Sequence, residues 1–361
     1  MTRALVIEAS GELWGSERAL LDLLGATSNL ELAVCCPPHM PLNTELGRRQ
    51  IRILPYYAYG LHQKSRVCRL KAAAGVLKAC VQFRPDVIYL NQSGCYKVAL
   101  LAATVLNLPI VAHVRIFEDA AYLAAQSPRP QRLRAMIAIS SAIETELRRF
   151  SQLDSIELHR VYDGYSRSVP PCQAAVQESA VNRIACVGRV VPIKGQDILV
   201  KALCLLGKSG QSGECVFVGN GDERFVSELK QMVSVAGCSF GIQWLGFVAD
   251  VFPILTTCSV LVCASHREPL GRVILEAWDA GAVPIVFAGS GGAAEIVGAS
   301  KGGILYDEQS PSSLAAALRE ALELNARCRE QFVNNGRDWM LHNCESQRYG
   351  AAISTILAEA A

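Results

Sequence analysis

The sequence lacks the signals that would place it in several common protein classes. Its longest apolar stretch, Val98–Val114, is interrupted by Asn107 and Pro109, so it predicts a helix followed by a strand and no membrane span. The early apolar run Ala4–Ile7 is too short for a signal peptide and is followed by Glu8. Low-complexity segments and short-period repeats are also missing, which excludes a solenoid.

An excess of charge of one sign is missing too. The 35 Lys and Arg residues nearly balance the 33 Asp and Glu residues, which leaves a net charge of +2. This balance excludes a chain that binds polyanions over its whole surface. Residues 1–165 carry 19 basic and 14 acidic side chains, whereas residues 166–361 carry 16 and 19. We therefore expect the two halves to have different electrostatic roles.

The 14 cysteines form no C-x-x-C pair. Several lie in apolar runs such as Ser259–Cys263, which predicts small buried side chains with free thiols. Free thiols are typical of a reducing compartment, so we expect a cytoplasmic protein without a disulfide or zinc framework. Peripheral contact with the inner face of the membrane stays open.

The sequence does contain many apolar residues, and they are arranged in a regular pattern. Hydrophobic residues make up 51% and charged residues 19%, so the chain can bury a core, and its length favours two domains. Short apolar runs alternate with helical patterns, which predicts parallel sheets covered by helices on both faces. The predicted strands are Ala4–Ile7, Leu32–Cys36, Ile51–Leu54, Val87–Leu90, Ile110–Val114, Ile137–Ile139, Ile184–Val187, Val216–Val218, Ile242–Leu245, Val260–Cys263 and Val283–Val286.

The fold class is thus α/β, with two doubly wound domains side by side. Residues 1–165 form the first domain, 166–182 a linker with Pro170 and Pro171, and 183–344 the second domain. The final segment, 345–361, is predicted to be a helix that either caps the second domain or packs back on the first. Ligands of such sheets bind beyond the carboxyl ends of the strands, so the loops there are the candidate sites.

The first such loop is Ser10–Glu17. Gly15 permits close backbone approach, and Ser16 can cap a helix whose N–H groups would face an anion. The spacing matches neither G-x-G-x-x-G nor a P-loop. A tight turn with a helix cap is an equally good interpretation.

Two loops of the second half carry more chemistry. Arg189 and Lys194 follow a predicted strand and precede a helix that begins near Gly195, so two cations are placed to hold a pyrophosphate. A pair of solvated surface cations is the alternative. Further on, Glu268 lies in a Pro/Gly loop and Glu276 on an otherwise apolar helical face, where a carboxylate needs donors such as sugar hydroxyls.

These motifs resemble the retaining glycosyltransferases of family four, which have the GT-B architecture and use nucleotide-sugar donors. The resemblance covers about residues 183–325 in the order of the family, and it is weaker in the N-terminal half. The matching segments are Gly188–Gly195, Val218–Gly221, Leu245–Val248, Glu268–Gly271, Glu276–Ala277, Ala280–Gly281 with Pro284, Gly291–Val297, and, more weakly, Gly15–Glu17, His113, Ile139–Ile143 and Val161–Gly164. It implies two Rossmann-like domains facing a central cleft.

The resemblance also implies roles for the donor site. Arg189 and Lys194 would bind the diphosphate, and Glu276 would hold the ribose hydroxyls. Glu268 would contact the donor sugar, with the backbone N–H groups of Leu270 and Gly271 beside it.

Further roles implied by the resemblance fall on other loops. The backbone near Phe247 and Val248 would meet the base, and Gly219 would belong to the same donor site. From the first domain, Gly15 and Ser16 would approach the phosphate and His113 the transferred sugar, although a lone His is more often a satisfied core residue.

Three positions depart from the family pattern. Asp163 stands where the family often has Asn, Leu270 replaces a frequent Phe, and Arg272 adds a cation beside the donor loop. None of these removes a key group.

No D-x-D pair occurs in the chain, so we expect no metal ion and no other cofactor. Metal-dependent transferases use such a pair to hold a cation at the phosphate, and here Arg189 and Lys194 would take that place. The predicted activity is transfer of a hexose from a UDP- or GDP-sugar to a hydroxyl acceptor in a polysaccharide, a glycolipid or a small molecule. A phosphorylase or sucrose-synthase-like transferase and a non-catalytic nucleotide-sugar-binding or scaffold protein are the alternatives.

The acceptor side of the chain is basic. Between Leu46 and Pro85 there is no acidic residue, and Val67–Phe83 predicts a helix with Leu70, Ala74 and Leu77 on one face together with Val81. The nine basic residues of this span are Arg48, Arg49, Arg52, Lys64, Arg66, Arg69, Lys71, Lys78 and Arg84, and Tyr56, Tyr57 and Tyr59 lie near them. We predict docking to anionic lipid or to a lipid-linked or phosphorylated acceptor, and a helix with a solvated basic face is the commoner alternative. Nucleic acid is not expected, because no recognition motif is present.

Overall fold

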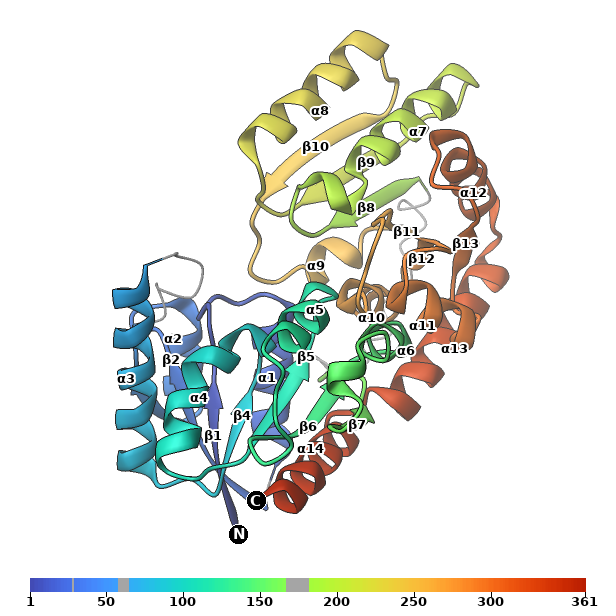
Figure 1. Ribbon diagram of the computed structural model, residues 1–361. Helices are drawn as coiled ribbons and strands as arrows, with labels where there is room; N and C mark the ends of the chain where they lie inside the picture. Colours follow the sequence, from blue (N-terminus) through green and yellow to red (C-terminus); the bar gives the residue numbers. More distant parts are fainter. Residues whose placement is uncertain (28, 58–64, 167–181) are drawn as a thin grey trace. The chain divides into compact units, whose positions relative to one another are not determined.

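The computed structural model divides the chain into two compact α/β units (Figure 1). Unit 1 contains Met1–Ser166 and Cys344–Ala361, and unit 2 contains Arg167–Asn343. The structure describes residues 1–27, 29–57, 65–166 and 182–361. All of the predicted linker except its two end residues lies outside the described residues, and so do the tyrosine at 59 and the lysine at 64.

Unit 1 is built on a seven-stranded parallel sheet with the order β3-β2-β1-β4-β5-β6-β7. Strands β4 and β5 and the last four residues of β1 are completely buried and mostly apolar, because helices cover both faces of the sheet. The strands are β1 (Thr2–Ile7), β2 (Leu30–Cys36), β3 (Arg52–Pro55), β4 (Val87–Leu90), β5 (Ile110–Val114), β6 (Leu133–Ala138) and β7 (Glu157–Arg160).

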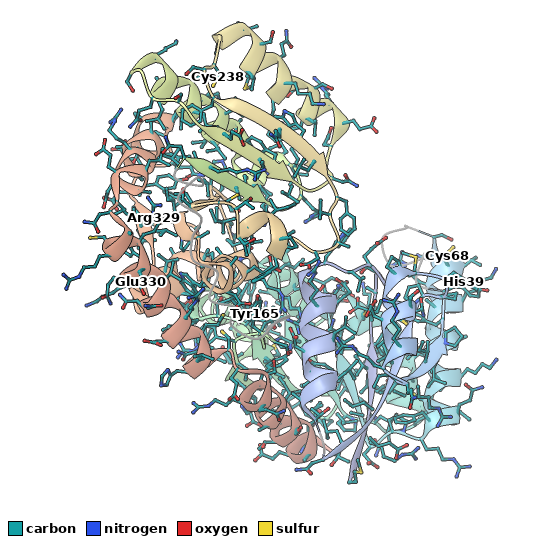
Figure 2. The ribbon with its side chains drawn as sticks, turned by 180° about the vertical axis from the view of Figure 1, so that it is seen from behind. His39, Cys68, Tyr165, Cys238, Arg329 and Glu330 are labelled. Atoms are coloured by element: carbon teal, nitrogen blue, oxygen red, sulfur yellow. The ribbon has the colours of Figure 1, made fainter. Side chains whose placement is uncertain are left out.

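Seven helices belong to the described part of unit 1, and the last comes from the end of the chain. They are α1 (Gly15–Ala26), α2 (Pro41–Arg48), α3 (Arg66–Phe83), α4 (Tyr96–Val105), α5 (Glu118–Ala125), α6 (Ser141–Leu147) and α14 (Ser346–Ala360). Helix α14 packs against α1 and strands β1, β4, β5 and β6, and its buried Ile353 and Leu357 are part of the core of unit 1. Tyr165, labelled in Figure 2, donates its backbone N–H to the carbonyl of Cys344 at 2.7 Å, so the chain segments that leave and re-enter unit 1 are paired.

Unit 2 is a six-stranded parallel sheet with the order β10-β9-β8-β11-β12-β13. Its strands are β8 (Arg183–Val187), β9 (Glu214–Val218), β10 (Gly241–Gly246), β11 (Val260–Cys263), β12 (Val283–Phe287) and β13 (Ile304–Tyr306). Its helices are α7 (Gln196–Lys208), α8 (Glu223–Ala236), α9 (Phe252–Leu255), α10 (Arg272–Ala280), α11 (Gly292–Ser300), α12 (Pro311–Glu323) and α13 (Ala326–Asn343).

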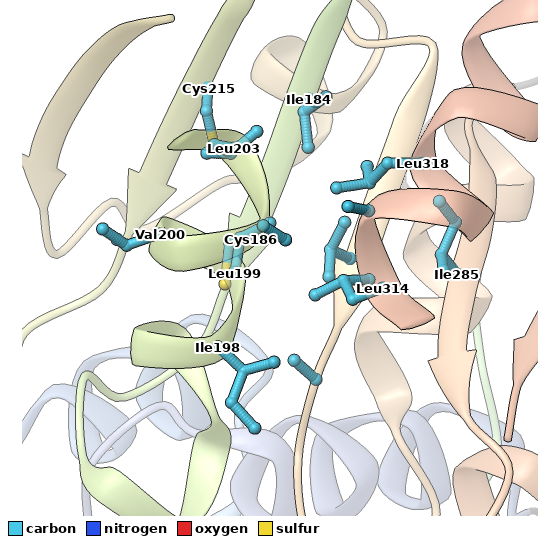
Figure 3. Packing of buried hydrophobic residues seen from close by; sticks show 14 of the residues in the cluster. Ile184, Cys186, Ile198, Leu199, Val200, Leu203, Cys215, Ile285, Leu314 and Leu318 are labelled. Carbon is cyan, nitrogen blue, oxygen red and sulfur yellow. The ribbon is translucent and has the colours of Figure 1, made fainter. Parts of the chain in front are cut away.

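The core of unit 2 lies between this sheet and helices α7 and α12. Leu199 and Leu203 of α7 and Leu314 and Leu318 of α12 are completely buried there, and they pack with strand residues such as Ile285 (Figure 3). The spacing of four residues between the two leucines of each helix places them on one face of that helix. This packing fixes the loops that follow the strands.

Every strand predicted from the sequence overlaps a strand of the structure, and two strands were not predicted. The first, β7, reads Glu-Leu-His-Arg and is only partly buried, and the second, β13, has three residues. Both lie at sheet edges, where a strand needs no continuous apolar run. Within the described residues, no helix combines the length and the apolar character needed to cross a bilayer.

Candidate functional site

The strand order of unit 2 points to one place on its sheet. Strand β8 lies between β9 and β11. The chain continues from β8 to β9 and β10 on one side of the sheet and then crosses to β11, β12 and β13 on the other, so a topological switch point lies at the carboxyl ends of β8 and β11. The loop after β8 contains Arg189 and Lys194, and the loop after β11 contains Glu268. The sequence-predicted phosphate and sugar residues are therefore brought together by adjacent strands.

Lys194 and Glu268 form an ion pair across this switch point. The Lys194 Nζ donates to Glu268 Oε2 at 2.6 Å, and both side chains stay partly exposed. Burial is the largest single influence and lowers the pKa of Lys194. The charge of Glu268, the neighbouring Cys263 and the hydrogen bond to Glu268 together raise that pKa by more, so the net shift is upward and the ammonium stays charged. The lysine is thus held in position by a carboxylate that solvent can reach.

Arg189 adds a second cation to the same edge. It is exposed, and its positive charge lowers the pKa of Lys194, in the same direction as burial but with the smallest effect of the groups around that lysine. The Arg189 carbonyl accepts a 2.8 Å bond from Gln196 Nε2, which ties this loop to the first residue of α7. Two cations on one loop can meet one diphosphate.

Glycines bring the neighbouring loops into backbone contact. A Cβ at Gly219 would lie 2.0 Å from the carbonyl oxygen of Gly188, and one at Gly221 would lie 1.9 Å from that of Val190. Val190 N–H donates to the Asn220 carbonyl at 3.0 Å, which closes the contact. Gly219 is therefore required by packing, whatever else it contacts.

The predicted base-binding segment follows β10. Phe247 is 52% exposed, and its backbone N–H donates to the Asn220 side-chain oxygen at 2.9 Å. Val248 is half-buried. Asn220 thus orients the Phe247 backbone, a role that sequence analysis missed although the residue lies between two glycines of a motif it identified.

Three helices of unit 2 begin at this edge without a side-chain cap. Helices α7, α10 and α11 have Gly195, Gly271 and Gly291 as their N-cap residues, and a glycine supplies no side chain to cap the first N–H groups. Elsewhere in the unit, Asp222 caps α8 and Ser310 caps α12. Uncapped N-termini carry positive partial charge, so this edge favours a bound anion.

The remaining predicted donor residues lie on or before α10. Glu276 is half-buried in the second turn of the helix, and Leu270 has a buried side chain, so only its backbone can meet a ligand. Gly271 has φ +84, and a Cβ there would lie 2.9 Å from Ile274 Cδ1. Glycine is therefore needed at this helix start for conformation and for space.

Two serines beside Glu268 were not predicted. Ser265 is buried and donates its hydroxyl to Glu268 Oε2 at 3.0 Å, so it fixes the carboxylate that holds Lys194. The buried Ser290 hydroxyl has no hydrogen-bond partner among the described residues, although the Ser290 carbonyl accepts from Glu268 N–H at 2.6 Å. The available signal was the position of Ser265 three residues before Glu268 and of Ser290 within the Gly/Ser-rich string 289–292.

In unit 1, the first loop has an open glycine. A Cβ at Gly15 would meet no atom within 4 Å, and Gly15 itself is exposed at the first residue of α1. The prediction that Ser16 caps the helix is wrong, because the N-cap position is Trp14 and Ser16 lies inside the helix. The Ser16 hydroxyl instead accepts from Gln92 Nε2 at 2.9 Å.

His113 is wholly buried inside a polar network of unit 1. It is the fourth residue of β5, and its Nδ1 lies 2.6 Å from the Tyr89 hydroxyl and 3.2 Å from Arg115 Nη2. Because Arg115 can only donate, Nδ1 is the acceptor and Nε2 carries the proton. Burial and then the charge of Arg115 lower the pKa of His113 well below its usual value, so the ring is neutral. Contact between this ring and a sugar stays a prediction.

Arg115 is the centre of that network. Its Nη1 donates to Asp163 Oδ1, its Nε donates to the Asn91 carbonyl at 2.9 Å, and its Nη2 contacts the Tyr349 hydroxyl at 3.2 Å. Both ends of the Arg115–Asp163 ion pair are buried. Asp163 therefore holds a cation inside unit 1, which accounts for a carboxylate at the position where the resembled family often has an amide.

A separate hollow of about 650 Å³ lies in unit 1, beyond the ends of β2 and β3. It is lined by Pro38, His39, Met40, Pro41, Asn43, Thr44, Ile53 and Pro55. None of the predicted site residues lines it. The charged groups and the helix N-termini converge at the β8–β11 switch point and not at this hollow.

Comparison with known proteins gives a family match that lies within unit 2. Residues 175–339 match the family model described as "Glycosyl transferases group 1". A mannosyltransferase of Mycobacterium tuberculosis, named as GDP-mannose-dependent and acting on phosphatidylinositol monomannoside, is 33% identical over 168 residues, or 44% of this chain and 42% of the relative. The alpha-maltose-1-phosphate synthase of Mycolicibacterium smegmatis is 30% identical over 207 residues, 52% of each protein. The matched region thus spans about half the length of these curated relatives.

Solved structures match over the whole chain. The Anabaena protein HepE, solved with UDP and glucose, gives a TM-score of 0.81 at 20% identity and covers 99% of this chain and 100% of its own. Sucrose-phosphate synthase of Thermosynechococcus elongatus gives 0.78 at 18% identity, covering 99% of both chains. Both show two parallel-sheet α/β domains of the GT-B type, so the predicted fold class is confirmed. Residues 175–339 are therefore similar in sequence to the group 1 glycosyl transferases, and the chain as a whole has the fold of GT-B glycosyltransferases.

Proposed function

We propose that the chain is a retaining glycosyltransferase of family four that moves a hexose from a UDP- or GDP-sugar to a hydroxyl acceptor. The observation that carries the proposal is the Lys194–Glu268 ion pair at the β8–β11 switch point, beside three helices that begin without a side-chain cap. Such an edge offers fixed positive charge to a diphosphate and a carboxylate to a polar sugar. The named activities of the relatives support the same reaction class.

The donor diphosphate would displace Glu268 as the partner of Lys194. Lys194 is already charged and oriented by Glu268, so little rearrangement is needed when phosphate oxygens arrive. Arg189 would bind the same diphosphate, and Glu268, still held by the Ser265 hydroxyl, would accept from sugar hydroxyls. Glu276 would accept from the ribose hydroxyls, and the backbone at Phe247 and Val248 would meet the base.

The chemical step would be a same-face displacement at the anomeric carbon. The bond between that carbon and the diphosphate oxygen breaks, and its electron pair leaves with the nucleoside diphosphate. The acceptor oxygen bonds to the anomeric carbon, and its proton goes to a leaving phosphate oxygen. Lys194 and Arg189 would stabilise the charge that develops on the phosphate, which is the largest contribution expected from fixed groups.

We further propose that these two cations do the work of a metal ion. The sequence has no D-x-D pair to hold one. Activity should then survive dialysis against EDTA, with added Mg²⁺ or Mn²⁺ giving no more than a small increase. Loss of all turnover in EDTA and its recovery with Mg²⁺ would contradict the metal-independent mechanism while leaving the transferase activity intact.

A thermal-shift panel tests the donor class. UDP, GDP and ADP and their sugar conjugates are compared, because a ligand that binds only the folded state raises the Tm. One nucleotide series should raise the Tm, and Lys194→Ala should reduce that shift while Lys201→Ala, on the exposed part of α7, should not. The anomeric configuration of the product, read by NMR, then tests retention. A Tm unmoved by every nucleotide would contradict the proposal.

A further inference from the structure

Helix α3 carries three large apolar side chains on the outside of unit 1. Val67, Leu70 and Val81 are 60%, 66% and 57% exposed. The side that packs against the rest of the unit is lined mostly by smaller residues: Ala72, Ala73, Val76, Ala79, Cys80 and Phe83. The face that the sequence predicted from Leu70, Ala74, Leu77 and Val81 therefore exists, and it points away from the core.

This outer face is a continuous stripe. Positions 67, 70, 74, 77 and 81 are three and four residues apart, so they follow one another along the same side of an α-helix. Cys68, labelled in Figure 2, marks the first turn of α3 at the outer side of unit 1. An exposed apolar stripe of this length on a helix indicates an interaction surface.

Positive charge borders the stripe. Lys71 and Lys78 each lie four residues after a stripe position and are exposed, and Arg66 begins the helix. No Asp or Glu occurs anywhere from Leu46 to Pro85. A helix with an apolar stripe edged by lysine is suited to the boundary between lipid headgroups and acyl chains, where the charges attract anionic lipid.

The neighbouring helix extends the same character. Helix α4 packs beside α3 and exposes Lys97, Leu101 and Val105, again at spacings of four residues. Exposed Tyr57, on the segment that leads to α3, adds an aromatic side chain suited to the headgroup region.

We infer that α3 docks unit 1 onto an anionic phospholipid surface, with Val67, Leu70 and Val81 entering the interface and Lys71 and Lys78 facing the headgroups. The occupant is a bilayer because basic charge and apolar surface are combined on one helix, and no acidic residue that could attract a basic partner occurs between Leu46 and Pro85. This inference does not depend on the proposed transferase activity.

Vesicle co-sedimentation of the full chain tests the inference. Vesicles of phosphatidylcholine with phosphatidylglycerol should bind the chain, and pure phosphatidylcholine should bind it far less. Lys71→Gln with Lys78→Gln should lower the partition coefficient about 30-fold, since each basic residue at an anionic surface contributes roughly a fivefold factor. Val67→Ser, Leu70→Ser and Val81→Ser together should lower it by at least about tenfold.

A matched control lies on α8 of unit 2. Val235 is 80% exposed and Lys230 is exposed on the same helix, so Val235→Ser with Lys230→Gln changes the same kinds of side chain elsewhere. This variant should bind anionic vesicles like the parent, and circular dichroism should show all variants folded. Equal binding to neutral and anionic vesicles, or unchanged binding of both α3 variants, would overturn the inference. Self-association in vesicle-free solution that the α3 serine variant abolishes would also overturn it and assign the stripe to a second copy of the chain.

Discussion

The two sheets place polar side chains at corresponding edges, but they use them differently. At the β8–β11 edge of unit 2, Lys194 and Glu268 are paired and still partly exposed. At the β1–β4 edge of unit 1, Glu8 and Asn91 are completely buried and bonded to each other, and Arg115 and Asp163 are nearly so. The same position in a parallel sheet thus holds an open charged pair in one unit and a closed network in the other.

This difference in burial separates charged groups that a ligand can reach from charged groups that stabilise the folded state. A buried ion pair leaves an uncompensated charge when one partner is removed, which costs stability. A partly exposed pair can exchange its partner for a ligand at little cost in stability. Substitutions in unit 1 should therefore change unfolding, and substitutions at the edge of unit 2 should change turnover.

The largest effect on stability is expected for Asp163→Ala. It leaves the buried Arg115 guanidinium without its carboxylate, and we expect the free energy of unfolding to fall by about 3–5 kcal/mol in urea titrations. The control Glu144→Ala removes a partner of Arg148, whose side chain is 64% exposed, and should change stability by less than about 1 kcal/mol. Similar small losses in both variants would mean that the network of unit 1 is not structural.

The largest effect on catalysis is expected for Lys194→Ala. Loss of one fixed charge at the leaving phosphate should lower kcat by about 10²–10³. Steady-state kinetics would measure this once a donor and acceptor are found, with Lys201→Ala, which removes an exposed lysine paired with Asp197, as the control. Near-normal turnover of Lys194→Ala would refute the role of the lysine.

Two glycine-to-alanine substitutions, one in each unit, compare the space available for a Cβ atom. In unit 2, Gly221→Ala would place a Cβ 1.9 Å from the Val190 carbonyl oxygen and should lower stability by about 1–3 kcal/mol. In unit 1, Gly15→Ala meets no atom within 4 Å and should change stability by less than about 0.5 kcal/mol. If Gly15→Ala also leaves nucleotide affinity unchanged in titration calorimetry, then Gly15 does not approach a ligand.

A pH dependence of stability is also expected, and it comes from Glu8. Burial, and then the charge of Glu17, raise the pKa of Glu8 from 4.5 to about 8. Between these values the folded state binds more protons at Glu8 than the unfolded state does, so the contribution of Glu8 to stability falls as pH rises through that window.

Urea midpoints measured from pH 5 to pH 9 would test this, and Glu8→Gln should flatten the profile. A steeper profile in Glu8→Gln than in the parent would contradict the assignment. His113 acts in the opposite direction, since its lowered pKa makes its contribution fall as pH drops below 6.5.

Most of the strands and the predicted donor loops could be identified from the sequence because each depends on residues that are close together in the chain. Buried parallel strands are short apolar runs, and loops such as Gly188–Gly195 combine glycines with charged residues at strand ends. The partially exposed edge strands β7 and β13 lack that signal and were missed.

Contacts between distant residues were not predictable in the same way. The residues around Asp163 in the sequence do not indicate that it pairs with Arg115, which lies 48 residues earlier. The spacing of Leu70, Ala74, Leu77 and Val81 indicated a helix with an apolar face but could not say which side of α3 meets the core, because its other side is apolar too. Ser16 was misplaced because α1 begins one residue before it.

The return of α14 to unit 1 has a consequence for how the chain acquires its structure. Tyr349, Ile353 and Leu357 fill part of the first sheet's core, yet a ribosome makes them only after every residue of unit 2. Unit 1 is therefore synthesised first but can complete its fold only after unit 2 has been synthesised. The chain thus cannot finish folding one unit at a time from its N-terminus. Until α14 arrives, the surface it will cover on α1 and the sheet remains apolar and unprotected, so nascent chains stalled inside unit 2 should depend on chaperones.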